Sequence, residues 1–145
     1  MPTMFDAIRK VQSGEMPAPP IAELIGFSLR EAEPGRAVVE FEAQPRHANP
    51  MGTLHGGVLC DVADAAMGIA YAATLGEGET FTTLELKINF LKPVWTGKLV
   101  ATGRVVKGGH TVGLVECDVT DVADQLVARA SSTCMTLRGA QAAGR

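Results

Sequence analysis

Hydrophobic and polar residues alternate along several short runs of this chain. In residues 36–44, RAVVEFEAQ, apolar side chains recur at every second position with two glutamates between them. Residues 82–94, TTLELKINFLKPV, show the same period of two, which is typical of a strand with one buried face. The side chains expected to face inward are Ala37, Val39, Phe41 and Ala43 in the first run and Leu84, Leu86, Ile88 and Phe90 in the second.

Four further runs complete the expected sheet. Residues 27–35, FSLREAEPG, predict a partner strand with a turn at Pro34 and Gly35. Residues 97–106, 111–121 and 126–137 are also strand-like, and the separators WTG, KGGH and VADQ are of hairpin size. Because connections this short favour antiparallel pairing of consecutive strands, we expect the last four strands to form a meander.

Three segments show helical spacing instead. Residues 3–12 and 21–26 predict two short helices, and residues 56–75 predict one long helix that is apolar nearly all round. A helical wheel turns one side of the long helix toward the sheet, with Val58, Val62, Ala65, Ile69 and Ala73. The opposite side carries Asp64 together with Cys60, Ala63, Met67, Gly68, Tyr71 and Leu75.

These elements predict an α+β domain in which an antiparallel sheet of about six strands wraps around one long central helix, since that arrangement buries the apolar faces of both. A chain of 145 residues fits one domain. We expect a helical cover at residues 1–25, a core at residues 26–138 and a flexible tail at residues 139–145.

Composition and charge exclude several classes of protein. The chain is 46% hydrophobic and 20% charged, as an ordinary globular protein is, and its net charge of -3 gives no basic field to attract nucleic acid. Its three cysteines are an odd number without CxxC spacing, which favours neither a disulfide framework nor a zinc site. The N-terminal residues contain no continuous apolar segment, so we expect a cytoplasmic protein without a membrane anchor or a bound metal.

The long helix raises a question about its two acids. No Lys, Arg or Glu lies between Gly56 and Gly76, and a helix that is apolar on all sides is covered on all sides. One sheet covers one side, so we expect a second copy of the chain to cover the other. Asp64 would then be partly desolvated and available for chemistry, whereas Asp61 has a structural explanation in the favourable dipole at the helix N-terminus.

The start of the same helix predicts an anion-binding site. The sequence LHGG places His55, Gly56 and Gly57 at a helix N-terminus, where backbone N–H groups are free to bind a negative oxygen. A carboxylate two turns further on brings an oxyanion donor and an acid to one region of the molecule.

The residues NPMGTLHGG, VLCDVAD and TTLELKINFLKPV, followed by the closing strands, resemble the hotdog-fold acyl-CoA thioesterases of the phenylacetate-degradation (PaaI-like) family over residues 20–138. The resemblance implies hydrolysis of an aryl- or medium-chain acyl-CoA to the free acid and CoA. It implies no cofactor, because CoA is part of the substrate, and an assembly of homodimers into a homotetramer.

The resemblance also implies roles for individual residues. The Gly56 amide would polarise the thioester carbonyl, and Asp64 would act as general base or nucleophile. Asn49 and His55 would shape the site near the thioester. A threonine from the facing subunit would help to place the water, and both Thr83 and Thr82 fit that position.

Other residues are candidates for substrate binding. Residues 86–115 contain no Asp or Glu but several basic residues, which predicts either a surface for the CoA phosphates or an ordinary solvated face. The candidates in this zone are Arg104, Lys107, Gly109 and His110, and those nearer the helix are Gly57, Met67 and Thr82, with Met67 expected in the acyl pocket beside Met51 and Tyr71.

Two alternatives to hydrolysis remain. A hotdog hydratase or dehydratase of acyl thioesters would want a histidine base, and the His-Phe-Pro run of such dehydratases is absent. A non-catalytic acyl-CoA-binding protein would bind the same ligand without turnover.

Overall fold

The computed structural model describes all 145 residues as one α+β unit. Two short helices come first, α1 (Met4–Ser13) and α2 (Pro20–Ile25). The core elements follow as β1 (Phe27–Glu33), β2 (Arg36–Ala43), α3 (Gly56–Ala72), β3 (Thr80–Phe90), β4 (Gly97–Gly108), β5 (Val112–Asp121) and β6 (Leu126–Leu137). Single 3-10 turns at Pro45–His47 and Gly139–Ala142 complete the chain.

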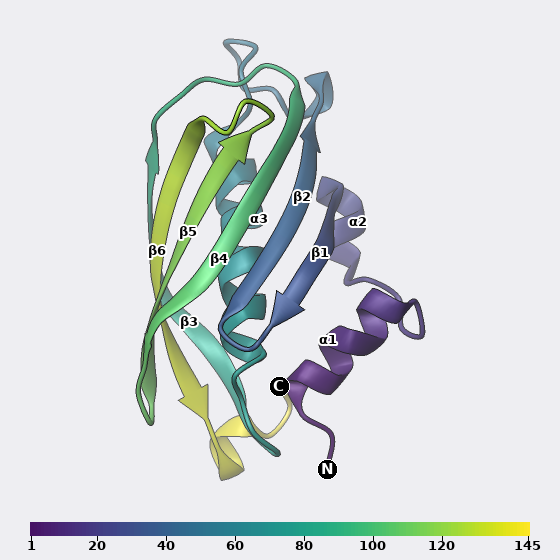
Figure 1. Ribbon diagram of the computed structural model, residues 1–145, viewed down its shortest axis with the longest axis vertical. Helices are drawn as coiled ribbons and strands as arrows, with labels where there is room; N and C mark the ends of the chain where they lie inside the picture. The colour runs from purple at the N-terminus through teal and green to yellow at the C-terminus, as the bar shows by residue number, and fades with distance from the viewer.

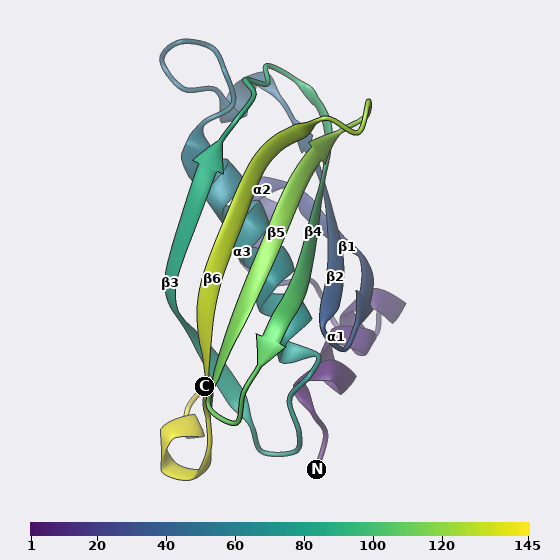
Figure 2. The ribbon, with the colours of Figure 1, turned by 60° about the vertical axis from the view of Figure 1, so that its left-hand side comes forward.

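The six strands form one antiparallel sheet in the order β1-β2-β4-β5-β6-β3, and α3 lies along one face of it (Figures 1 and 2). This is the hotdog fold. The expectation of a four-strand meander is wrong for β3, which pairs with β6 at the far edge, while β4 pairs with β2.

The connection from β3 to β4 explains that order. The backbone N–H groups of Leu91 and Lys92 both donate to the carbonyl of Val127, at the start of β6. A few residues later the carbonyl of Val94 accepts from the N–H of Leu54, just before α3. This segment therefore crosses the end of the sheet instead of turning back as a hairpin.

The core lies between α3 and the inner face of the sheet, where Val39, Leu99, Val115 and Val119 are almost completely buried. Gly103 of β4 allows the helix to approach closely, because a Cβ atom there would lie 2.5 Å from the carbonyl oxygen of Ala66. The outer face of the sheet carries cross-strand ion pairs.

The helical wheel was only partly right about the side of α3 that faces the sheet, because Val62 and Ala73 are buried as expected but other expected residues are not. Ala63, Met67 and Tyr71 are buried against the sheet, with exposed fractions of 2% or less, whereas Ala65 and Ile69 are only half-buried. Small and apolar residues occur on every side of this helix, so a helical wheel shows no distinctly apolar side. The expectation that Asp64 points away from the sheet is confirmed, since its side chain is exposed.

Leu84 of β3 departs from the expected alternation. The pairing with β6 shifts between Thr83 and Glu85, so Leu84 is the extra residue of a β-bulge and is 54% exposed instead of inward-facing. Leu86 and Ile88 resume contact with the core beyond the bulge.

The N-terminal segment packs beside the sheet and the helix. Thr3 and Asp6 form a capping box at the start of α1, and Gly14 ends the helix in the left-handed conformation. Figure 1 shows α1 beside the lower half of α3, next to β1. No helix of this chain is long and apolar enough to cross a membrane.

Candidate active site

The N-terminus of α3 presents one free backbone donor. His55 is the N-cap residue, and its Nδ1 accepts a hydrogen bond from the N–H of Gly57 at 2.8 Å. This bond fixes the ring with Nδ1 as acceptor and occupies the Gly57 amide. The N–H of Gly56 has no acceptor within the chain, so it is the group at this helix end that is available to a carbonyl oxygen.

Phe90 lies directly against this donor. A Cβ atom added at Gly56 would lie 2.7 Å from Cζ of the Phe90 ring, so only glycine fits here without displacing the aromatic side chain. Phe90 is 55% exposed, which is unusual for a residue expected to point into the core. Sequence alternation identified Phe90 as a strand residue, and its contact with the helix start depends on the three-dimensional pairing.

Asn49 organises the loop before α3. Its Oδ1 accepts from the N–H groups of Met51 and Thr53, and its Nδ2 donates to the hydroxyl of Thr53. His47 connects the same loop to α2, because its Nε2 lies 2.9 Å from the carbonyl oxygen of Ile25 while its own carbonyl accepts from the N–H of His55. The side chain of Asn49 thus holds the shape of the loop in this chain.

Asp64 and Asp61 line the same groove on the side of α3 that faces away from the sheet. Desolvation by the surrounding protein raises the pKa of the Asp64 carboxyl above its ordinary value, and the negative charge of Asp61 raises it further. Asp61 lies beyond the first helical turn, where the helix dipole has little effect. The dipole explanation of Asp61 is therefore wrong, and its electrostatic effect on Asp64 is the feature that the structure shows.

The two threonines of β3 point to opposite sides. Thr83 pairs with Cys134 on the helix-facing side, with its hydroxyl 3.9 Å from the Cys134 sulfur. Thr82 pairs with Met135 on the outer side. Burial raises the pKa of the Cys134 thiol, against smaller lowering contributions from its neighbours Thr83 and Ser132, and the charge of Asp64 adds to the increase. Of the two threonines, Thr83 therefore lies on the helix-facing side, next to the Cys134 thiol whose pKa the charge of Asp64 raises.

The acid-free stretch is only partly neutralised by ion pairs: Arg104 and Lys92 have acidic partners, whereas Lys87, Lys98 and Lys107 have none. Antiparallel pairing places β5 beside β4, and the guanidinium of Arg104 contacts Glu116 at 3.0 Å and Asp118 at 3.9 Å. Lys92, in the connection between β3 and β4, pairs with Asp121 at the end of β5.

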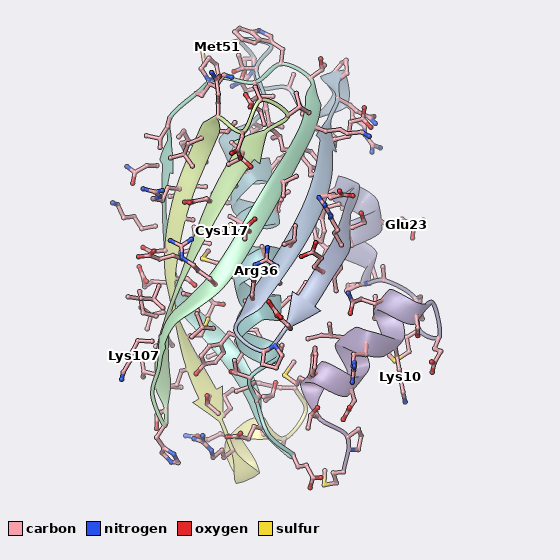
Figure 3. The ribbon with its side chains drawn as sticks, viewed as in Figure 1. Lys10, Glu23, Arg36, Met51, Lys107 and Cys117 are labelled. Atoms are coloured by element: carbon pink, nitrogen blue, oxygen red, sulfur yellow. The ribbon has the colours of Figure 1, made fainter.

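The remaining candidates of this zone lie at the β4–β5 turn. The Gly109 N–H donates to the carbonyl of Val112, and the carbonyl of His110 accepts from Arg138. Figure 3 shows Lys107 at the lower end of the sheet and Met51 in the loop at the opposite end. Met67 and Tyr71 are buried under the sheet. None of these residues lines the groove that contains Asp64.

The groove has a wall that sequence reasoning missed. It has a volume of about 540 Å³ and lies between α3 and the N-terminal segment, which contributes Ile8, Val11 and Ile21. The helical spacing of apolar residues in α1 was the available signal, but it predicted a cover and not the lining of a site.

Comparison with known proteins gives the family of the chain. The model of the Thioesterase superfamily matches residues 51–128. Human acyl-coenzyme A thioesterase 13 is 28% identical over 136 residues, which cover 92% of this chain and 96% of that protein. The 1,4-dihydroxy-2-naphthoyl-CoA hydrolase of Listeria monocytogenes is 31% identical over 107 residues, which cover 74% of this chain and 87% of that protein.

A solved structure shows the same fold. The crystal structure of a phenylacetic acid degradation-related protein from Ralstonia eutropha JMP134 matches with a TM-score of 0.81 and 30% identity, covering 88% of this chain and 97% of that one. The chain therefore belongs to the Thioesterase superfamily. The expected fold, the PaaI-like resemblance and the enzyme class of a thioester hydrolase are confirmed.

Proposed function

We propose that this protein hydrolyses acyl-CoA thioesters, with Asp64 as the carboxylate that drives the reaction. The observation that carries the proposal is the Asp64 carboxyl in an apolar groove, with a pKa raised by desolvation and by Asp61. Perturbed acids in clefts are typical of catalytic sites. The CoA thioesters named for the human and Listeria relatives give the substrate class.

The chemistry requires an electrophile, a nucleophile and a leaving group. The Gly56 N–H donates a hydrogen bond to the carbonyl oxygen and stabilises the negative charge that develops there. In one form of the reaction, Asp64 accepts a proton from water while the water oxygen attacks the carbonyl carbon. The C–S bond then breaks, and the CoA sulfur leaves with that proton as a thiol. In the other form, Asp64 attacks the carbonyl carbon itself, the C–S bond breaks and the CoA thiolate leaves. Water then hydrolyses the resulting anhydride, which releases the acid, regenerates the Asp64 carboxylate and supplies a proton to the thiolate.

The spacing of these groups supports a site shared by two copies. Gly56 and Asp64 are eight residues apart on α3, so they are separated by about 12 Å along the helix axis. Reacting groups must approach within about 3–3.5 Å of one thioester. Two antiparallel copies of α3 related by a two-fold axis would bring the Gly56 amide of one copy to the Asp64 of the other.

The free edge of β3 supports the same assembly. This edge strand is 11 residues long and has exposed apolar side chains at Leu84 and Phe90, whereas monomeric proteins usually protect such edges. The N-terminal segment covers part of the side of α3 that a second copy was expected to cover. The free edge of β3 is therefore a stronger reason to propose a homodimer than the apolar helix is. The homotetramer follows from the family resemblance.

Light scattering should give at least twice the monomer mass, and Leu84→Lys should weaken the dimer and lower activity together.

The function is tested by measuring thiol release from a panel of aryl-, short- and medium-chain acyl-CoAs. Steady release of free CoA thiol, with one acid formed per thiol, is the expected result. Tight binding of acyl-CoA with the thioester recovered intact would instead establish a non-catalytic binding protein. Addition of water across an acyl double bond without thiol release would establish a hydratase.

A further inference from the structure

We infer that the N-terminal segment, residues 4–22, forms one wall of the acyl pocket and selects apolar acyl chains of medium length. This inference rests on the proposed function, because it assigns the acyl group to the groove that contains Asp64. The segment precedes the residues matched by the family model, which begin at residue 51.

The lining of the groove fits a hydrocarbon chain. Its wall is apolar along α1, α2, β1, α3 and β3, represented by Ile8, Ile21, Phe27, Ile69 and Phe81. Its polar side chains are only Gln12, Ser28, Asp61 and Asp64, and no Lys, Arg or His lines it. A carboxylated acyl group or the phosphates of CoA would find no cation there, and a polyhydroxylated ring would leave most of its hydroxyl groups without partners.

The dimensions of the groove fit a medium-length chain. Its volume of about 540 Å³ lies within the ordinary range of small-molecule sites. Along α3 the lining runs from Asp61 to Ala72, and the part from Asp64 to Ala72 is about 12 Å long along the helix axis. The thioester would lie at the carboxylate end, and the methyl end of the acyl chain would lie toward α1, which sits beside the C-terminal half of α3 (Figures 1 and 2).

The apolar side of α1 is available for a ligand. The helix has helically spaced Met4, Ile8 and Val11, yet none of its residues is fully buried. Ile21 also lines the groove and remains 47% exposed. Such a partly covered apolar stripe gains stability when a hydrocarbon chain removes it from water.

The test compares chain-length profiles of kcat/KM for butanoyl-, hexanoyl-, octanoyl- and decanoyl-CoA. In the wild-type protein, each added methylene should raise kcat/KM about fourfold until the groove is filled. Ile8→Trp narrows the groove and should lower kcat/KM for octanoyl- and decanoyl-CoA about tenfold or more, with butanoyl-CoA changed less than about twofold. Val11→Trp should act in the same direction.

Ala7→Trp is the matched control, because Ala7 is exposed on the same helix and outside the groove. It should leave the profile unchanged. A profile that Ile8→Trp and Val11→Trp leave unchanged, or an equal loss for all chain lengths, would overturn the assignment of the acyl chain to this groove. Absence of thiol release from every acyl-CoA by the wild-type protein would instead overturn the proposed function, so the two failures are distinct.

Discussion

Asp61 and Asp64 lie one turn apart on the same side of α3, and the charge of Asp61 contributes to the raised pKa of Asp64. The larger contribution is desolvation of the Asp64 carboxyl. The charge of the exposed Asp61 therefore affects the protonation of Asp64, the acid that we propose as the catalytic group. Substitution of Asp61 tests that coupling without altering the reacting side chain.

Asp61→Asn should move the acid limb of the pH–rate profile to lower pH. Asp64 works in its ionised form, so activity is lost as pH falls through its folded pKa. Removing the neighbouring negative charge lowers that pKa and preserves activity at more acidic pH. The measurement is kcat/KM for one acyl-CoA as a function of pH, with Asp124→Asn as a charge-matched control in the distant β5–β6 turn. An acid limb that stays in place, or moves to higher pH, would contradict the electrostatic assignment.

Asp64→Asn should make the folded protein more resistant to heat at neutral pH. A raised folded pKa means that the folded state binds the proton more tightly than the unfolded state does. The associated stability is complete below the unfolded pKa of the carboxyl and is lost as pH rises through the folded value. Asparagine resembles the protonated acid, so the gain in Tm should be present at pH 7 and should vanish in acid. Calorimetry at the two pH values checks this.

A contrasting substitution controls for a general effect of charge removal. The guanidinium of Arg129 binds Asp118 with contacts of 2.7 and 3.2 Å, and this hydrogen bonding lowers the pKa of Asp118. The stability from Asp118 is therefore present above its unfolded pKa and is lost as pH falls through its lowered folded value. Asp118→Asn should lower Tm at neutral pH. A loss of Tm in Asp64→Asn as well would show that the Asp64 charge is stabilising, contrary to our account.

Gly56→Ala should lower kcat/KM by about tenfold to a hundredfold, because small displacements of a catalytic donor are costly. The added Cβ would collide with the Phe90 ring, and either the ring or the start of α3 must move. The double variant Gly56→Ala with Phe90→Ala should recover part of the activity that Gly56→Ala loses. The cost of Gly56→Ala should therefore be smaller when it is measured against Phe90→Ala than against the wild type. Thiol-release kinetics of the three variants checks this. If the double variant is no better than Gly56→Ala, contact with Phe90 is not the reason that position 56 requires glycine.

The sequence predicted local structure well where one period dominated. In β2 the alternation placed Ala37, Val39, Phe41 and Ala43 on the buried face, and all four are buried. The LHGG sequence predicted the start of α3 at Gly56. Both features depend on neighbours in the chain, so their signals are local.

The features that sequence reasoning missed depend on contacts between distant segments. The pairing of β3 with β6 brings Thr83 beside Cys134, and no local pattern encodes that partner. Arg104 appeared unpaired because Glu116 and Asp118 follow the basic stretch in the chain, although they lie beside Arg104 in the sheet. The groove likewise joins Ile8 to Asp64 across more than fifty residues.

The most direct test of the account is kcat/KM of Asp64→Asn with the preferred acyl-CoA, measured on protein whose fold and oligomeric state match the wild type. Loss of the general base or nucleophile should lower kcat/KM by about 10² to 10⁴-fold while acyl-CoA still binds. Asp124→Asn removes an equivalent charge from a turn with a φ of 60°, which asparagine also tolerates, and should retain full activity. Near wild-type hydrolysis by Asp64→Asn would contradict the account.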